Sequence, residues 1–194
     1  MPSDPFNLKE LIFEKIAGGA RVYDLEGNLL LYAEREGISK LGKSIHVYPS
    51  KHVKREILTL KPLQKSLKEV IDLRMPVGLN FEVVEPSGES LGVIRQTSVR
   101  ERKLTKVVID EWLIEVNGEV VAKLEEVSLV RHLIRSYFFP CKYQIVSKGE
   151  VIGSFEQLRK FTPFRYRMKI DIQKVSTKLL VAWGILYSIL SVRF

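Results

Sequence analysis

The sequence predicts an all-β fold that encloses one buried α-helix. Segments in which apolar and polar residues alternate recur in pairs, and a short polar turn containing glycine joins the members of each pair. The last apolar segment, residues 179–192, is apolar around its whole circumference, as expected of a helix buried in a core. Long amphipathic helices do not alternate with the strands, which disfavours a parallel sheet of βαβ units.

Four of the paired segments predict regular β-hairpins. Alternation places one face of each hairpin on a core and the other face in water. The hairpins are expected at residues 22–35, 81–96, 112–126 and 143–157. A fifth, less regular hairpin is expected to turn at residues 48–51, between arms at 44–47 and 55–60.

The turn residues support these hairpins. In Asp24-Leu25-Glu26-Gly27, the aspartate opens a type I turn and the glycine closes it in a left-handed conformation that can form a bulge. Pro86 presets the φ angle of a second turn that Gly88 closes. Asn117-Gly118 is a strong hairpin signal because both residues tolerate positive φ, and Lys148-Gly149 is a weaker example.

So many hairpins require a sheet that closes or stacks, because open edges attract other strands. The composition of the apolar C-terminal segment best fits a helix that runs through the centre of a barrel. Fourteen residues at 1.5 Å each span roughly 21 Å, which is short of the ~30 Å hydrocarbon core of a bilayer. A C-terminal membrane anchor is therefore an undersized alternative.

The length of the chain predicts one domain over residues 1–194, and this length is enough to bury a full core. Cys141 is the only cysteine, so no disulfide joins two parts of the chain, and the first residues lack the pattern of a secretory signal. We therefore expect a cytoplasmic protein that can associate peripherally with a membrane. Residues 127–139 fit either a short helix that Pro140 ends or an irregular strand, and the helix is favoured.

The net charge of +8 is unevenly distributed along the sequence. Residues 40–68 hold eight Lys or Arg against one acid, and residues 159–169 hold five against none, whereas residues 101–126 hold seven acids against four cations. This pattern predicts a bipolar molecule whose basic face attracts lipid headgroups, nucleic acid or acidic proteins. The alternative is a basic surface that is simply solvated.

Two groups of cations are the candidate contacts for an anion. The first group comprises Lys40, Lys43, Lys51, Lys54 and Arg55. The second group alternates with aromatic and aliphatic residues over 164–170, which predicts a strand whose outward row is Arg165, Arg167 and Lys169.

Residues 37–44, from Gly37 to Ser44, match the P-loop pattern G-x-x-x-x-G-K-[ST] in full. In a P-loop, backbone amides cradle phosphates, Lys43 would reach the terminal phosphates and Ser44 would hold Mg²⁺. Asp110, after an apolar run, resembles the acid that assists the metal. The motif must open a helix, however, and the residues after Ser44 read as a strand stopped by Pro49.

Catalytic, metal-binding and cofactor-binding sites are not predicted. The histidines, His46, His52 and His132, lack the spacing of a zinc site. Cys141 and His132 are more typical of a structural junction than of a nucleophile and its base.

Hairpins are expected at residues 80–94 and 117–124, and a strand at 168–172 leads into a final apolar helix at 178–193. In these features the chain resembles the Tubby C-terminal-like superfamily. The segment 29–60 is similar to the first strands of its phospholipid-scramblase and LURP-one-related branches. The resemblance covers nearly the whole chain. It implies a closed barrel of about twelve strands around a central helix at about 176–193. It also implies a basic surface, since Tubby proteins bind phosphoinositides.

The sequence departs from the scramblase pattern at the calcium site. Residues 169–174, just before the last helix, hold a single carboxylate, Asp171, whereas Ca²⁺ takes six to eight oxygen ligands. The palmitoylated cysteine cluster of some scramblases is also missing, because Cys141 stands alone. Calcium-driven lipid scrambling is therefore not expected.

The sequence as a whole predicts a non-enzymatic barrel domain without a cofactor that binds an anionic partner. By the resemblance, the favoured partner is a phospholipid membrane surface. A nucleotide-binding protein that uses residues 37–44 and a nucleic-acid-binding module are the alternatives, and a protein partner stays open.

Overall fold

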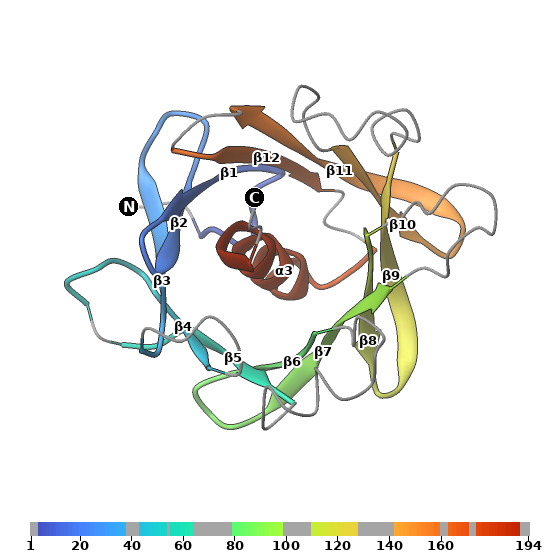
Figure 1. Cartoon of the computed structure of the whole chain (residues 1–194), viewed down its shortest axis with the longest axis horizontal. Helices are drawn as coiled ribbons and strands as arrows, with labels where there is room; N and C mark the ends of the chain where they lie inside the picture. Colours follow the sequence, from blue (N-terminus) through green and yellow to red (C-terminus); the bar gives the residue numbers. More distant parts are fainter. Residues whose placement is uncertain are drawn as a thin grey trace.

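The predicted fold class is confirmed. The computed structural model describes residues 4–37, 43–53, 55–63, 79–98, 110–127, 142–159, 163–170 and 174–190. In these ranges, twelve antiparallel strands form a closed barrel, and one helix runs through it (Figure 1). The short helix expected at residues 127–139 falls almost wholly outside the described residues.

The strands are separated along the chain by connections of very different lengths. They are β1 (Glu10–Ile16), β2 (Gly19–Tyr23), β3 (Leu29–Arg35), β4 (Ile45–Tyr48), β5 (Leu58–Pro62), β6 (Asn80–Val84), β7 (Ser90–Ser98), β8 (Asp110–Val116), β9 (Glu119–Glu126), β10 (Lys142–Ser147), β11 (Glu150–Arg159) and β12 (Arg165–Ile170). The helix, α3, spans Thr177–Leu190 and lies within the range expected for it.

Each strand pairs with the next one in the sequence, and β1 closes the ring by pairing with β12. In that closing pair, Leu11 is opposite Met168 and Phe13 is opposite Tyr166. All four side chains are buried. Closure leaves no free edge on the sheet, which removes the hazard of pairing with other chains.

The up-and-down order gives the barrel two distinct rims. We call the rim at which α3 begins the N-rim; the β2–β3, β4–β5, β6–β7, β8–β9 and β10–β11 connections lie there. The opposite rim, where α3 ends, is the C-rim. The connections β1–β2, β3–β4, β5–β6, β7–β8, β9–β10 and β11–β12 begin and end at it.

The four regular hairpins are confirmed, and their turns form as the residues predicted. Gly27 (φ 89°) follows Asp24, and the β2–β3 register shifts at Val22 and Tyr23 as a bulge requires. Asn117 and Gly118 both adopt positive φ, 53° and 82°. Four of the five N-rim connections are therefore tight turns.

Two features of the wall differ from the sequence analysis. The fifth hairpin pairs β4 with β5 through residues 49–57, which is longer than the four-residue turn expected at residues 48–51. The other is β1, which was not predicted. Its inward residues, Leu11 and Phe13, flank another apolar residue, Ile12, so strict alternation of apolar and polar residues is absent.

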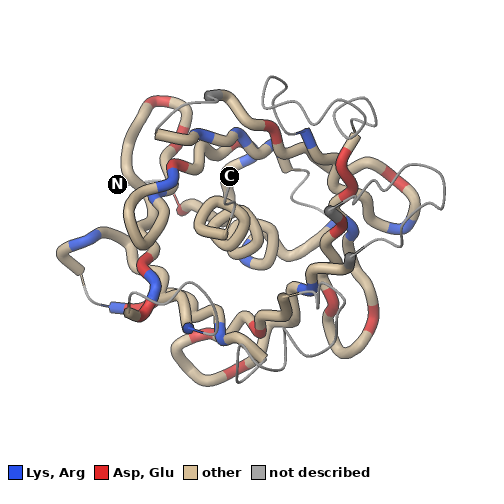
Figure 2. The backbone as a smooth tube through the Cα atoms, viewed as in Figure 1, with Lys and Arg blue, Asp and Glu red and all other residues tan. Residues whose placement is uncertain are grey.

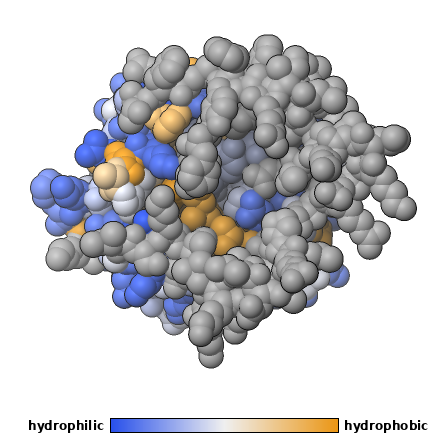
Figure 3. All heavy atoms as spheres, viewed as in Figure 1, coloured by the Kyte–Doolittle hydropathy of each residue, from blue (hydrophilic) through white to orange (hydrophobic). Residues whose placement is uncertain are grey.

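The helix is buried because aromatic side chains of the wall surround it. Trp183 lies in edge-to-face contact with Phe155 (4.7 Å between ring centroids) and Tyr143 (5.8 Å), and Tyr187 contacts Tyr166 (5.5 Å). In a space-filling view, apolar atoms are visible near the centre of the molecule, and hydrophilic atoms are most evident at its left side (Figure 3). Burial on all sides accounts for the uniformly apolar sequence of this helix.

Two ion pairs tie the start of α3 to hairpin turns of the N-rim. Lys178 Nζ lies 2.5 Å from Glu85 Oε1 in the β6–β7 turn. Lys174, just before the helix, pairs with Glu150 at the start of β11. Both pairs are partly exposed, so they contribute modestly to stability, but they position the first turn of the helix.

We predict that Gly184→Ala destabilises the protein. A Cβ at this position would lie 2.6 Å from the Phe13 ring and 2.8 Å from the Met168 methyl group. The helix or β1 would have to shift, and such overpacking typically costs about 1–3 kcal/mol. Urea unfolding should show this loss, whereas Val151→Ala at an exposed position should change little. An unchanged midpoint for Gly184→Ala would contradict the close packing of α3 on β1.

Candidate functional site

The second predicted group of cations lies where the alternation placed it. Arg165, Arg167 and Lys169 form the outward row of β12, while Tyr166 and Met168 point into the core. Each of the three cations, however, meets a carboxylate from a neighbouring strand. Arg167 pairs with Glu156 on β11, and Lys169 Nζ lies 3.1 Å from Glu10 Oε1 on β1.

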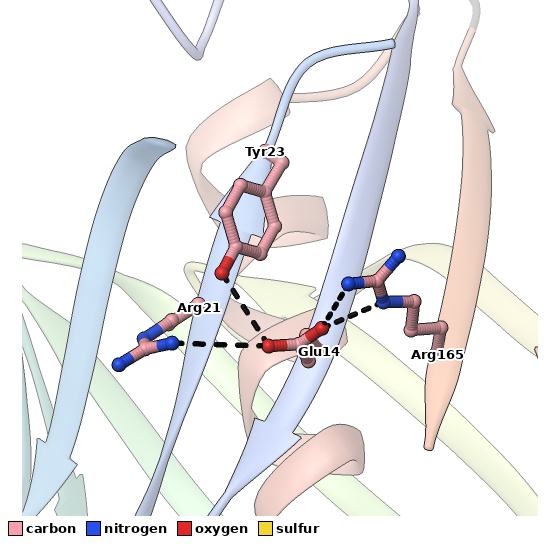
Figure 4. Close-up of polar contacts among 4 residues, drawn as sticks. All are labelled: Glu14, Arg21, Tyr23 and Arg165. Atoms are coloured by element: carbon pink, nitrogen blue, oxygen red, sulfur yellow. Dashed lines mark hydrogen bonds and ion pairs between the residues drawn. The ribbon is translucent and has the colours of Figure 1, made fainter. Parts of the chain in front are cut away.

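Arg165 takes part in a cluster around Glu14 on β1 (Figure 4). Its Nε and a terminal nitrogen lie 2.6 Å and 2.5 Å from Glu14 Oε2. On the other side, Arg21 lies 3.9 Å from Glu14 Oε1, and the Tyr23 hydroxyl donates to that oxygen at 3.4 Å. Glu14 is buried although it sits on an outward position, because these side chains cover it. The cluster links β12, β1 and β2 across the closure.

The pairing changes what the β12 row can do. The row is cationic along β12, but carboxylates of β1 and β11 neutralise it across the sheet. The hydrogen bond that Arg167 donates to Glu156 raises the pKa of Arg167. An anion approaching this face would compete with carboxylates already in place, so the row is better suited to holding the barrel closed.

The structure separates the first predicted group. Lys43 precedes β4 at the C-rim, whereas Lys51 and Arg55 lie in the β4–β5 connection at the N-rim. All three are exposed. Lys40 and Lys54 lie outside the described residues. The first group therefore does not form one surface, because β4 runs from rim to rim between its members.

The P-loop match does not have the helix that the motif requires. Gly37 adopts positive φ (71°) after β3, and residues 38–42 lie outside the described residues. The residues that follow Ser44 form strand β4, so a helix N-terminus is not available to bind phosphate there. Asp110 opens β8, as expected.

A polar cluster on the outer face of β3–β5 was not predicted. His46 lies opposite Glu34 across β3–β4, and its Nδ1 is 3.0 Å from Glu56 Oε1, without the geometry of a hydrogen bond. Thr59 donates a hydrogen bond to Glu56 at 2.8 Å. Burial, with the nearby charges of Glu56 and Glu34, raises the pKa of Tyr48. Within the described residues, no group of three His, Cys, Asp or Glu is arranged to hold a metal ion.

Two carboxylates of N-rim turns are held ionised by their hydrogen bonds. The Asn28 side chain lowers the pKa of Asp24, and the Lys174 ammonium lowers the pKa of Glu150. A lowered pKa in the folded state means that each group stabilises the fold above its ordinary pKa and loses that contribution as pH falls. At neutral pH, both carboxylates are therefore ionised.

The strands and the helix carry no net charge. Their printed ranges hold twelve Lys or Arg and twelve Asp or Glu. Cations and acids lie side by side around the wall rather than on separate faces (Figure 2). The formal charge of +8 therefore comes entirely from residues outside these elements.

Comparisons with known proteins bear on the fold alone. Neither the family models nor the curated proteins give a match to this chain. Among solved structures, the chain is similar to the X-ray structure of an Arabidopsis thaliana protein, AT5G01750. The two share 12% sequence identity over 97% of this chain and 94% of that chain, with a TM-score of 0.52. The likeness spans the barrel and its helix.

Within the residues that the structure describes, no helix combines the length and the apolar character needed to cross a bilayer.

We predict that Glu14→Gln destabilises the barrel more than Glu156→Gln does. The first change leaves Arg165 and Arg21 without their buried carboxylate, and loss of such a partner costs about 1–3 kcal/mol where the arginines keep some access to water. Glu156 is more exposed, so water can replace its pairing with Arg167. Urea midpoints of the two variants should differ in that order. Equal midpoints would mean that the Glu14 cluster does not stabilise the closure.

Proposed function

We propose that this protein is a non-enzymatic barrel domain that binds the surface of an anionic phospholipid membrane. The resemblance of its hairpins and final helix to the Tubby C-terminal-like superfamily, in its scramblase and LURP-one-related branches, supports a lipid partner. The similarity to the Arabidopsis thaliana structure is consistent with that fold at the coarser level of the barrel.

One observation carries the proposal: the excess positive charge of this chain is not neutralised within the strands and the helix. Strands and helix balance their own charges, and the surplus lies in the connections. Exposed lysines of the connections, such as Lys43, Lys51 and Lys148, form no ion pair among the described residues. Each Lys or Arg near an anionic bilayer contributes about 1 kcal/mol. Several together would give reversible, salt-sensitive binding.

We expect the protein to co-sediment with vesicles that contain phosphatidylserine but not with vesicles of phosphatidylcholine alone. Binding should fall steeply between low salt and 0.5 M salt, because screening weakens exposed charges. A single-stranded oligonucleotide serves as a competitor. Vesicle binding that survives excess oligonucleotide supports the membrane. Failure to bind anionic vesicles at low salt, with retention of the oligonucleotide, would replace the proposal with nucleic-acid binding.

A further inference from the structure

The β4–β5 connection, residues 49–57, is the longest of the five N-rim connections. It projects outward from the wall at the left of Figure 1, away from α3. Its tip is a tight turn in which the backbone N–H of Val53 donates to the carbonyl of Ser50 at 3.4 Å. Lys51 and His52 occupy the centre of this turn, and both are exposed. The fold therefore holds these side chains out in water.

The charges that project from this connection are positive. Lys51 and Arg55 are exposed and form no ion pair among the described residues (Figure 2). Glu56 is the single acid of residues 49–57, and it is held against the wall. Thr59 donates a hydrogen bond to Glu56 at 2.8 Å, and Glu56 Oε1 lies 3.0 Å from His46 Nδ1. Because β4 and β5 hold the carboxylate, the outward part of the connection presents its cations.

An exposed aliphatic side chain stands among these cations. Val53 is 46% exposed and lies between Lys51 and Arg55 in the sequence. Other exposed aliphatic residues of the N-rim stand beside carboxylates instead, since Leu25 lies between two acids and Val151 follows an acid. An aliphatic side chain flanked by cations suits the boundary between lipid headgroups and acyl chains.

We infer that the β4–β5 connection is the segment that touches the anionic membrane, with Lys51 and Arg55 at the lipid phosphates and Val53 at the headgroup boundary. This inference rests on the proposed function and names the segment that performs it. The turns on either side, β2–β3 and β6–β7, each carry two acids and no Lys or Arg. An anionic surface would repel those turns. The membrane therefore meets the connection from its outward side rather than the N-rim as a whole.

The test compares two double variants with the same change of charge. Lys51→Glu with Arg55→Glu reverses the described cations of the β4–β5 connection. Lys123→Glu with Lys148→Glu reverses two exposed lysines of β9 and the β10–β11 turn, about half the ring of strands away. We expect the first variant to lose about tenfold or more in partitioning to phosphatidylserine vesicles. The second should stay within about threefold of the unaltered protein.

The outcomes separate the inference from the proposed function. If the unaltered protein does not bind anionic vesicles, both fail. If it binds and the control variant loses as much as the β4–β5 variant, or more, the inference is overturned while membrane binding stands. Circular dichroism and thermal melting show whether each variant is folded.

A second measurement replaces the charge reversal if that variant does not fold. Val53→Trp places an indole in the β4–β5 connection, and Val151→Trp places one at the exposed start of β11, whereas Trp112 and Trp183 are buried and form a constant background. Brominated lipids in anionic vesicles should quench the fluorescence of Val53→Trp and leave Val151→Trp unchanged. The reverse result, or equal quenching, would overturn the inference.

Discussion

The structure depends on the need to hide α3 from water on every side. A helix with one apolar face can rest on an open sheet, but the residues of α3 from Leu179 to Ile189 are buried around the whole circumference. Only a closed wall can cover such a helix. The wall must therefore be long enough to curl through twelve strands and return to its beginning. Pairing of β1 with β12 is the step that completes it.

That closing step explains where the charges of the wall lie. The β1–β12 seam joins residues more than 150 positions apart, as in the contact between Arg165 and Glu14. Inside the seam, Phe13 and Tyr166 contribute apolar burial, and outside it the acids of β1 meet the cations of β12. Opposite charges on adjacent strands favour this register over a slip by one residue, which would turn Phe13 out of the core. The cations of β12 thus act in closure.

The sequence predicts the fold well because its information is local. Alternation over a few residues and turn pairs such as Asn117-Gly118 specify hairpins without knowledge of distant contacts. The candidate site is predicted less well because it depends on which segments meet. Arg165, Arg167 and Lys169 read as a cationic row until Glu10, Glu14 and Glu156 are placed beside them. Lys43 and Lys51 are close in sequence, but β4 lies between them and carries them to opposite rims.

The cross-strand contacts that neutralise the wall do not act on the connections, which can therefore carry net charge. A strand residue on the outer face has fixed neighbours on both sides, so an unbalanced cation there would repel others across the ladder. Connections have no such register, and their side chains can add positive charge without destabilising the sheet. Tight turns occupy most of the N-rim, and the longer connections begin and end at strand ends of the C-rim. The wall that encloses α3 is therefore neutral, and the surplus charge of the sequence lies outside the strands and the helix.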